Sequence, residues 1–437
     1  MKIQFIGIGG VGISALAKML LNKGHQISGI NDSESKKTLQ ELYDKQAQIA
    51  IGTTPELLDE EADLYVYSVA WLQRAPELMQ KALDSGKAKS YFEALGDFAS
   101  SMELLAVSGT HGKTTTVAML HEILKAHNFA HETIVGSILA KEGSNYVAST
   151  QSSKHLLLEA CEYKRHFLYF YPTVLVITNI EAEHLDYYKD LDDVKDAFES
   201  FVKQSKNGAK IILGEDKEAE SLAQSLSKHL QDSGKHVIFA RSFSQDVPQL
   251  KVPGKHNRKN AAAALAAAAA ILNDKFSLPL AQDALANFSG TWRRQEFVAT
   301  LNGIDIYTDY AHHPSEIKAT IEAFKEKADA KNLAVVFEPH TYSRLQALFD
   351  EFAASFTGAH KVLVTPIYAA REEKVQNISS ESLAQAIAKF GIPASASLSY
   401  QEAFEDALSS ASGGGLLLVL GAGDVYDELL KFISGKK

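Results

Sequence analysis

Two glycine-rich loops, each set between an apolar strand pattern and a helical pattern, constrain this chain more than any other feature. The first loop spans 7–12 and precedes a helical pattern over 13–24, and the second begins at Gly109 after the apolar run 103–108. Glycine lets the backbone approach a phosphate closely, and the start of the following helix favours negative charge. The sequence therefore predicts two separate phosphate-binding loops on α/β sheets.

The first loop fits the dinucleotide fingerprint G-x-G-x-x-G from Gly7 to Gly12. Asp32 lies 20 residues beyond Gly12, at the end of the second predicted strand. Nothing in this pattern is specific for a nicotinamide ring. On the residues alone an NAD(P) site is favoured, and another pyrophosphate ligand such as a UDP-sugar, or a purely structural turn, remain as alternatives.

The second loop, GTHGKTTT, departs from the usual P-loop because its first glycine position falls on Val107. Val107 is expected to end the strand, so the loop is shortened at its front. Lys113 is then placed to contact β- and γ-phosphates, and the Thr114 hydroxyl to reach Mg²⁺. A solvated turn is the alternative.

Metal partners for this loop are expected at the carboxyl ends of neighbouring strands. Glu159 ends one predicted strand and His184 follows the next, so the two side chains are predicted to meet beside the phosphate loop. A carboxylate suits Mg²⁺, whereas histidine is an unusual ligand for so hard an ion. Each residue alone could be structural, and their joint placement favours a site.

The rest of the chain alternates strands and helices, which predicts an α/β protein with doubly wound, mostly parallel sheets. We expect three domains, at 1–100, 101–290 and 291–437. Segment 88–101 has no strong signal and is taken to link the first two. The further predicted strands are 2–8, 26–32, 63–70, 155–160, 173–180, 209–214, 303–311, 332–339, 361–366 and 415–424, and the further helices are 114–126, 257–272, 279–288, 314–328 and 401–411.

Composition narrows the class of protein. The chain has 437 residues, a net charge of -10 and no long block of like charge, which argues against nucleic acid as the main partner. Its longest apolar stretch, 261–272, is too short to span a bilayer, and the glycines of 7–12 argue against a signal peptide. With Cys161 as its one cysteine, the chain is expected to be a soluble cytoplasmic protein without disulfides.

Seven motifs occur in the order found in the Mur ligases, and on them the whole chain resembles that family. They are GTHGKTTT, LEACEYKRHFL, TNIEAEHLDYY, VPGKHNRKNAAAA, DYAHHPSEI, EPHTYSR and LGAGD. The segment EACEYKRHFL is similar to shorter versions of the L-alanine-adding enzyme. In that reading Cys161 is a buried motif position and not a nucleophile.

The resemblance implies a fold and an activity. The fold is an N-terminal Rossmann-like domain for a UDP-sugar, a central P-loop ATPase domain with a parallel or mixed sheet, and a C-terminal Rossmann-like domain for the amino acid. The activity is the ATP- and Mg²⁺-dependent ligation of L-alanine to UDP-N-acetylmuramate through an acyl phosphate. The expected partners are these small molecules, with no nucleic acid and no membrane, and the chain is expected to be a monomer or a weak homodimer.

The resemblance also implies roles for individual residues. The residues expected to contact the UDP-sugar are Gly9, Gly10 and Gly12, with Asp32 and Ser68 as weaker candidates. Those expected to contact ATP are Gly109, Thr110, His111, Gly112, Lys113, Thr114, Thr115, His256, Asn257, Asn260, Arg294 and Asp309. The amino-acid site is expected to hold His312, His340 and Arg344; the metal ligands are Thr114, Glu159 and His184; and the catalytic set is Lys113, His184, Arg294, His312 and Arg344.

Plainer readings stay open for some of these residues. His256 and the asparagines could be helix caps, and the residues of the C-terminal domain could be surface charges or core histidines. Lys195 lies in the helix that carries a carbamylated lysine in related ligases, but its offset from His184 differs, so we expect it to be unmodified.

Three other functions compete with this one. The nearest is the recycling ligase that attaches a tripeptide to the same sugar nucleotide. An NAD-dependent dehydrogenase would leave the second loop without a role, and a non-catalytic nucleotide-binding regulator would leave the paired metal ligands unexplained. Preference for alanine over serine or glycine cannot be read from the sequence.

Overall fold

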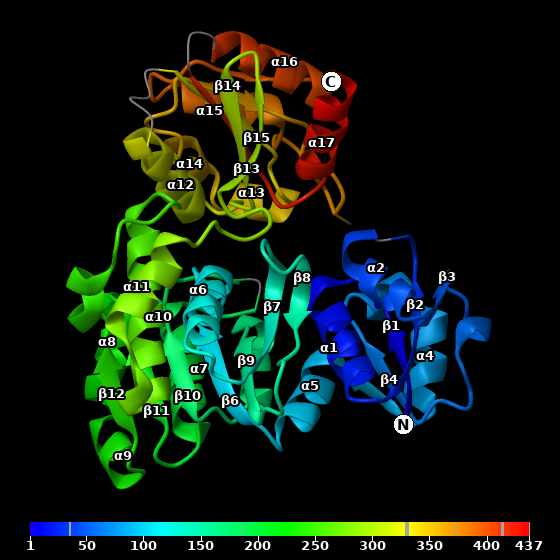
Figure 1. Cartoon of the computed structure of the whole chain (residues 1–437). Helices are drawn as coiled ribbons and strands as arrows, with labels where there is room; N and C mark the ends of the chain where they lie inside the picture. Colours follow the sequence, from blue (N-terminus) through cyan, green and yellow to red (C-terminus); the bar gives the residue numbers. More distant parts are fainter. Residues whose placement is uncertain (35, 186, 328–331, 371, 412–414, 437) are drawn as a thin grey trace. The chain divides into compact units, whose positions relative to one another are not determined.

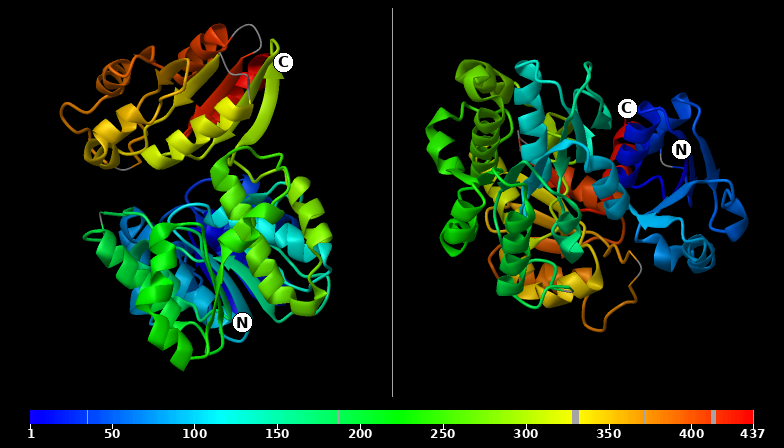
Figure 2. Two further views of the ribbon diagram at one scale, coloured as in Figure 1. Left: turned by 90° about the vertical axis from the view of Figure 1, so that its left-hand side faces the viewer. Right: turned by 90° about the horizontal axis from the view of Figure 1, so that it is seen from below.

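The structure is a computed structural model that describes residues 1–34, 36–185, 187–327, 332–370, 372–411 and 415–436. Three sheets follow one another along the chain, each within one colour range of Figures 1 and 2. Within the described ranges, no helix combines the length and the apolar character that a membrane crossing needs. The predicted α/β class with parallel and mixed sheets is confirmed.

The N-terminal sheet is parallel and has the strand order β3-β2-β1-β4-β5. Its order reverses between β1 and β4, and ligands of open α/β sheets bind at the carboxyl ends of strands beside such a point. The first glycine loop lies there. The elements are β1 (Lys2–Ile6), α1 (Val11–Asn22), β2 (Gln26–Asn31), α2 (Lys36–Asp44), β3 (Gln48–Ile51), η1 (Pro55–Leu57), β4 (Leu64–Tyr67), α3 (Trp71–Arg74), α4 (Pro76–Asp84), β5 (Ala88–Ser90) and α5 (Tyr91–Ala99).

The central sheet has the order β12-β11-β10-β6-β9-β7-β8 and is parallel except for the antiparallel pair β7–β8. Its strands are β6 (Glu103–Ser108), β7 (Glu132–Leu139), β8 (Ser144–Val147), β9 (His155–Glu159), β10 (Val174–Ile177), β11 (Lys210–Leu213) and β12 (His236–Phe239). Its helices are α6 (Lys113–Ala126), η2 (Tyr163–Tyr169), α7 (Leu191–Gln204), α8 (Lys217–Ser225), α9 (Ser227–Asp232), η3 (Ala240–Asp246), α10 (Lys255–Leu272), η4 (Asn273–Lys275) and α11 (Leu278–Ala286).

The C-terminal sheet has the order β13-β14-β18-β15-β16-β17, with one antiparallel pair, β13–β14. Its strands are β13 (Glu296–Leu301), β14 (Ile304–Asp309), β15 (Leu333–Phe337), β16 (Lys361–Val364), β17 (Ala394–Ala396) and β18 (Leu416–Leu420). Its helices are α12 (Pro314–Lys327), α13 (Tyr342–Ala347), α14 (Phe349–Ala354), α15 (Ser380–Ala388), α16 (Tyr400–Ser410) and α17 (Val425–Lys436). The predicted last residue of the helix over 314–328 lies outside the described residues.

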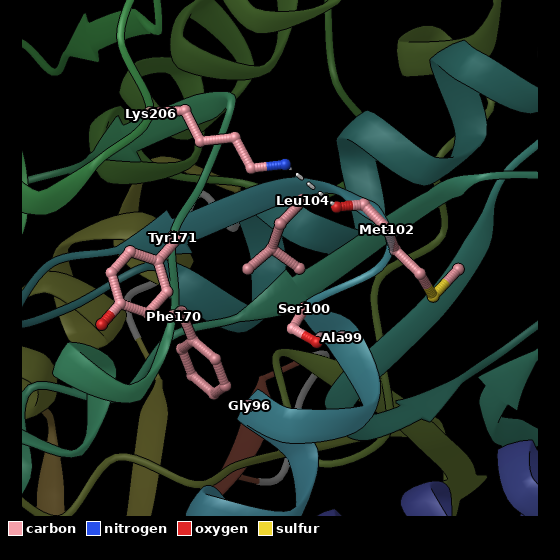
Figure 3. A pocket seen from close by; sticks show the side chains of 8 residues that line it. All are labelled: Gly96, Ala99, Ser100, Met102, Leu104, Phe170, Tyr171 and Lys206. Atoms are coloured by element: carbon pink, nitrogen blue, oxygen red, sulfur yellow. Dashed lines mark hydrogen bonds between the residues drawn. The ribbon is translucent and has the colours of Figure 1, made fainter.

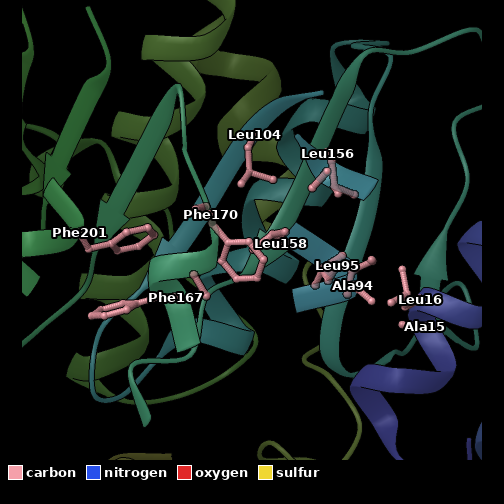
Figure 4. Packing of buried hydrophobic residues seen from close by; sticks show 14 of the residues in the cluster. Ala15, Leu16, Ala94, Leu95, Leu104, Leu156, Leu158, Phe167, Phe170 and Phe201 are labelled. Atoms are coloured by element: carbon pink, nitrogen blue, oxygen red, sulfur yellow. The ribbon is translucent and has the colours of Figure 1, made fainter. Parts of the chain in front are cut away.

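By its contacts the chain forms two compact units. The first is 1–249 with 259–288, and the second is 250–258 with 289–437. The first unit holds the N-terminal and central sheets because they share one apolar cluster, in which side chains of α1 and α5 converge with those of β6 and β9 (Figure 4). The second unit has apolar clusters on both faces of its own sheet. The three domain boundaries remain a proposal.

Among the elements that were not predicted from the sequence are two segments of the first unit. The stretch 88–101 forms β5 and α5, and the helix starts with a capping box in which the Ser90 hydroxyl and the Glu93 carboxylate each accept the other residue's backbone N–H. The hairpin β7–β8 fills the stretch between α6 and β9. It lacks the continuous apolar runs that mark buried parallel strands, and therefore gave no clear signal.

Candidate active site

The second glycine loop connects β6 to α6 at the carboxyl edge of the central sheet. Val107 pairs with Val176 inside the sheet, so it belongs to the strand as predicted. Gly109 has φ +130° and Gly112 has φ +81°, conformations that side chains rarely adopt. A Cβ at Gly109 would lie 2.0 Å from Thr178 Oγ1, so glycine is required by space as well as by conformation.

Asn179, which follows the neighbouring strand β10, forms hydrogen bonds with the backbone of this loop. Its side-chain oxygen accepts the His111 backbone N–H at 2.9 Å, and its amide donates to the His111 carbonyl at 3.0 Å. The Thr110 hydroxyl accepts the Glu181 N–H at 2.9 Å. Asn179 was not among the predicted site residues, although it stands within the motif TNIEAEHLDYY.

Lys113, the first residue of α6, reaches back over the loop. Its Nζ donates to the carbonyl oxygens of Gly109 (2.5 Å) and Thr110 (2.8 Å) and pairs with Glu162 Oε2 at 2.9 Å. Burial lowers the pKa of Lys113, but Glu162 and the other acidic groups around it together more than offset this, and the net pKa lies above its ordinary value. The lysine is therefore a fixed positive charge at the mouth of the loop.

Glu159, at the end of β9, contacts Thr114. The Thr114 hydroxyl lies 3.0 and 2.9 Å from the two oxygens of the Glu159 carboxylate, and the Gly136 N–H donates to the second of them at 2.9 Å. Thr114 and Glu159, two of the three predicted metal ligands, are thus in contact in the structure. A hydroxyl and a carboxylate side by side are oxygen ligands of the kind that Mg²⁺ prefers.

His184 contacts a different glutamate. Its Nε2 lies 3.6 Å from Glu162 Oε1, and ligand atoms of Glu162, Glu183 and His184 all lie within 4.8 Å of one another. Burial would raise the pKa of Glu162, but Lys113 and His184 hold it below its ordinary value, so the carboxylate is charged. Glu162 and Glu183 were missed, although both stand in motifs quoted for the resemblance. The two carboxylates fit a divalent cation, and the predicted ligand pair of Glu159 and His184 stays a proposal to which Glu162 is added.

Asn260 of α10 belongs to the same unit and stands against the loop. A Cβ at Gly112 would come within 2.3 Å of Asn260 Oδ1. The other residues of that motif, His256 and Asn257, fall in the second compact unit. There Asn257 donates to Gln295 Oε1 at 3.0 Å, and Gln295 Nε2 lies 3.2 Å from His256 Nε2. The structure thus divides this predicted nucleotide-contacting segment between the two units.

The first glycine loop lies at the carboxyl end of β1. Gly9 donates its N–H to Asn31 Oδ1 at 3.1 Å, and Gly10 is the N-cap of α1. Asn31, which the sequence analysis passed over, ends β2, and a Cβ at Gly9 would lie 2.5 Å from its Nδ2. The side chain of Asn31 therefore fixes the backbone of the loop just before the first turn of α1.

The weaker candidates lie around the same loop. A Cβ at Gly12 would lie 3.0 Å from the Tyr91 ring, so this glycine permits close packing of α1 on α5. The Asp32 carboxylate pairs with Arg74. Ser68 follows β4, and its N–H donates to the carbonyl of Ile6 in β1 at 2.9 Å. All three are therefore near the crossover point of the sheet.

In the second unit, Arg294 and His312 share one carboxylate. Glu316 Oε1 lies 3.7 Å from Arg294 Nη1, and Glu316 Oε2 lies 3.3 Å from His312 Nδ1. Asp309 accepts the backbone N–H groups of Gln295 and Ala311, each at 2.8 Å. Burial raises the pKa of Asp309 to about 6, against the opposing effect of the Arg294 charge.

His340 connects this cluster to Arg344. The His312 and His340 rings are 5.8 Å apart edge to face, and Arg344 Nη1 lies 3.3 Å from His340 Nδ1. Burial, with the nearby His312 and Arg344, lowers the pKa of His340 to about 4, so the ring is neutral at pH 7. The structure therefore brings together Arg294, His312, His340 and Arg344, which the sequence spreads over fifty residues.

Two further predicted residues have ordinary surroundings. Lys195 pairs with Glu218 at 2.5 Å on the surface, and its unmodified state stays a prediction. Burial raises the pKa of Cys161 to about 12, so its thiol is protonated at pH 7, which agrees with a structural position.

A cavity of about 270 Å³ lies on the first unit, lined by Gly96, Ala99, Ser100, Met102, Leu104, Phe170, Tyr171 and Lys206 (Figure 3). None of the predicted site residues lines it. It lies by the end of α5 and the start of β6, whereas the second glycine loop follows the other end of β6. We therefore assign no part of the site chemistry to it.

Three family models match successive parts of the chain. They are described as "Mur ligase family, catalytic domain" over 2–102, "Mur ligase middle domain" over 107–268 and "Mur ligase, glutamate ligase domain" over 293–423. The UDP-N-acetylmuramate–L-alanine ligase of Clostridium acetobutylicum is 38% identical, over 99% of this chain and 97% of its own length.

Solved structures show the same fold. The UDP-N-acetylmuramate-alanine ligase of Thermotoga maritima aligns with a TM-score of 0.78 and 24% identity, over 100% of this chain and 99% of its own. The murein peptide ligase of Psychrobacter arcticus aligns with a TM-score of 0.70 and 22% identity, over 99% and 98%.

Proposed function

This chain belongs to the Mur ligase family, and we propose that it joins L-alanine to the lactyl carboxylate of UDP-N-acetylmuramate, with ATP converted to ADP and phosphate. The product is a precursor of peptidoglycan. The observation that carries the proposal is the cluster at the second glycine loop, where Lys113, Thr114, Glu159, Glu162 and His184 converge from the ends of three strands, β6, β9 and β10.

The chemistry explains why such a cluster is needed. A carboxylate acylates an amine poorly because its leaving group would be oxide. Transfer of the γ-phosphoryl group from ATP makes an acyl phosphate, which the amine of alanine attacks with release of phosphate. Two anions, the carboxylate and ATP, must first be brought together, so catalysis consists mostly of positioning and of neutralising charge.

The residues of the first unit divide this work. Lys113 contacts the β- and γ-phosphates, and the loop amides from Gly109 to Thr115, with Asn260, hold the nucleotide. Thr114, Glu159, Glu162 and His184 offer ligands for Mg²⁺, which when bound neutralises charge on the phosphates. Gly9, Gly10 and Gly12 bind the pyrophosphate of the UDP-sugar, and Asp32 and Ser68 lie within the same region.

The residues of the second unit act on the amino acid and on ATP. Arg344 pairs with the carboxylate of alanine, because its planar fork matches that group. His312 and His340 line the same cluster, with His340 neutral at pH 7. Arg294 reaches the γ-phosphate, and Asp309, His256 and Asn257 contact the nucleotide.

Alanine is favoured over a tripeptide as the amine substrate. Eight curated relatives that are 36–38% identical over nearly the whole chain carry the name UDP-N-acetylmuramate–L-alanine ligase. The murein peptide ligase is more distant, and its likeness supports the fold alone. We place the reaction in the cytoplasm, where ATP is available, and expect a monomer or a weak homodimer.

The test is phosphate release by the purified chain with ATP, Mg²⁺ and UDP-N-acetylmuramate. We expect release that depends on L-alanine and is absent without the sugar nucleotide. Glycine and L-serine measure the selectivity for the side chain, and L-alanyl-γ-D-glutamyl-meso-diaminopimelate is the competing substrate. Release with the tripeptide alone would assign the recycling reaction, and tight binding of NADH to the protein would point to a dehydrogenase.

A further inference from the structure

The hairpin β7–β8 packs against α1, the helix that starts at the first glycine loop (Figure 1). Asn145 of β8 is fully buried in this contact. Its Nδ2 donates to the Val11 carbonyl at 2.5 Å and to Ser14 Oγ at 2.8 Å, and its Oδ1 accepts from Lys18 Nζ at 2.8 Å. Both ends of this amide are therefore used to hold α1.

Lys18 adds a buried charge to the same contact. Its side chain is 2% exposed, and its Nζ also lies 3.3 Å from Ser144 Oγ and 3.2 Å from Glu41 Oε2. Burial lowers the pKa of Lys18, and the Glu41 carboxylate opposes this effect. Because a buried ammonium is costly without all its partners, these bonds fix one register of the helix on the hairpin, which apolar packing alone would not do.

Val11 is the residue through which this contact reaches the loop. It is the first residue of α1 and follows Gly9 and Gly10 directly. The first N–H groups of a helix have no partner within the helix and are the groups that a pyrophosphate binds. A bond to the Val11 carbonyl therefore sets where the N–H groups of this first turn point.

The other strand of the same hairpin contacts Glu159, the carboxylate that faces the second glycine loop. Gly136 of β7 donates its N–H to Glu159, and a Cβ at this position would lie 2.6 Å from Glu159 Oε2. Glu159 in turn accepts the Thr114 hydroxyl. One hairpin thus contacts the start of α1 through Asn145 and the ATP-side carboxylate through Gly136.

We propose that Asn145 is a positioning residue for the UDP-sugar site, and that the hairpin β7–β8 is the common support that holds the first turn of α1 in register with the ATP loop. The proposal rests on the proposed function, because that function assigns the UDP-sugar to the first loop. Asn145 acts through the Val11 carbonyl and the Lys18 ammonium, without touching substrate.

The experiment compares Asn145→Ala with Tyr146→Phe. Tyr146 is the next residue of the same strand, and its hydroxyl bonds Glu132 and not the start of α1. We expect Asn145→Ala to weaken binding of UDP-N-acetylmuramate, measured by calorimetry, about tenfold and to raise its KM similarly, because a buried amide and its partners lose their bonds. The KM for ATP stays within about twofold, and hydrogen exchange of the peptide 9–20 becomes faster. Tyr146→Phe leaves both KM values unchanged.

The outcomes separate this inference from the function on which it rests. If wild-type protein binds no UDP-N-acetylmuramate, the assignment of the first loop is wrong and the inference falls with it. If wild type binds and Asn145→Ala binds equally well, or loses both nucleotides equally, only the inference is overturned. If Asn145→Ala does not fold, Lys18→Met is the second variant, because it keeps the apolar stem of the side chain. We expect it to lower the affinity for UDP-N-acetylmuramate by a smaller factor and to leave the KM for ATP unchanged.

Discussion

Glu159 and Glu162 are three residues apart and serve different neighbours. Glu159 ends a strand and faces Thr114, whereas Glu162 lies beyond the strand and faces Lys113 and His184. Glu162 is buried and charged, so it cannot be replaced without leaving Lys113 and His184 without their shared carboxylate. In the proposed reaction we therefore expect the two carboxylates to have distinct roles in holding the cations that face the phosphates.

Replacement of Glu162 by glutamine tests this division. We expect Glu162→Gln to lower alanine-dependent phosphate release by about 10²–10³-fold, the usual cost of losing a metal ligand or charge partner at such a site. Binding of UDP-N-acetylmuramate, measured by calorimetry, should be unchanged. Glu199→Gln, which removes a partly exposed carboxylate on α7, is the matched control. Activity within about threefold of wild type in Glu162→Gln would remove this residue from the site.

At the level of single residues, the sequence predicted those whose neighbours lie in the same motif. Gly109, Gly112, Lys113 and Thr114 form one loop, and their roles follow from their order. Glu162 was missed because its partners come from another strand end, and the strand-end rule selects only the last residue of β9. Asn179 was missed because it lay inside the predicted strand 173–180, whereas β10 ends at Ile177.

At the level of elements, the third glycine-rich segment shows that a loop of the right shape need not bind phosphate. LGAGD begins at Leu420, the last residue of β18, and leads into α17, as the other two loops lead into their helices. Here the Glu338 carboxylate accepts the N–H groups of Gly423 (2.8 Å) and Val425 (3.1 Å), and the Tyr400 hydroxyl at 2.6 Å. The protein's own carboxylate thus occupies the amides at the start of α17, which only the structure could reveal.

Contact between α6 and β7 depends on a buried pair of histidines. His121 Nδ1 lies 3.1 Å from His131 Nε2 and 2.9 Å from Thr133 Oγ1, and His131 Nδ1 lies 2.7 Å from the carbonyl of Phe129. The carbonyl can only accept, so His131 carries its proton on Nδ1 and accepts at Nε2. A second proton on His131 would lie on Nε2, which would then be a donor facing the donor Nδ1 of His121.

This pair predicts a pH dependence of stability. Burial and the neighbouring His121 lower the pKa of His131 to about 4, against about 6.5 in the unfolded chain. The unfolded state therefore takes up the proton first, so the stabilisation is fully present above pH 6.5 and is lost progressively as pH falls from about 6.5 to about 4. The full effect is about 3 kcal/mol. In urea unfolding at pH 7.5, 6 and 5, His131→Gln should lose stability less steeply than wild type.

The control for this measurement is His236→Gln, because His236 is exposed at the start of β12. It should keep the slope of wild type. Parallel slopes for wild type and His131→Gln would show that the His131 ring is protonated equally in the folded and unfolded states, against the buried neutral pair described above.

At the scale of the whole molecule, the α/β class and the order of the three sheets could be predicted because each sheet repeats the alternation of strand and helix. The partition into two compact units could not. It arises because α1 and α5 share an apolar cluster with the central strands, and because 250–258 packs with the C-terminal chain. Both depend on contacts between residues far apart in the sequence, such as Asn145 with Val11, which no local pattern encodes.

Two nucleotide loops within one unit predict that one can be disabled without the other. Lys113→Met keeps the apolar stem but removes the charge that faces Glu162 and that is proposed to contact the phosphates. We expect phosphate release to fall by at least about 10²-fold. UDP-N-acetylmuramate affinity, measured by calorimetry, should stay within about twofold, because the first loop contacts Asn31 and the hairpin β7–β8 and not Lys113. Lys154→Met, an exposed lysine before β9, is the control. Loss of UDP-sugar binding in Lys113→Met would mean that the two loops exchange roles, with the acceptor at the second loop and ATP at the first.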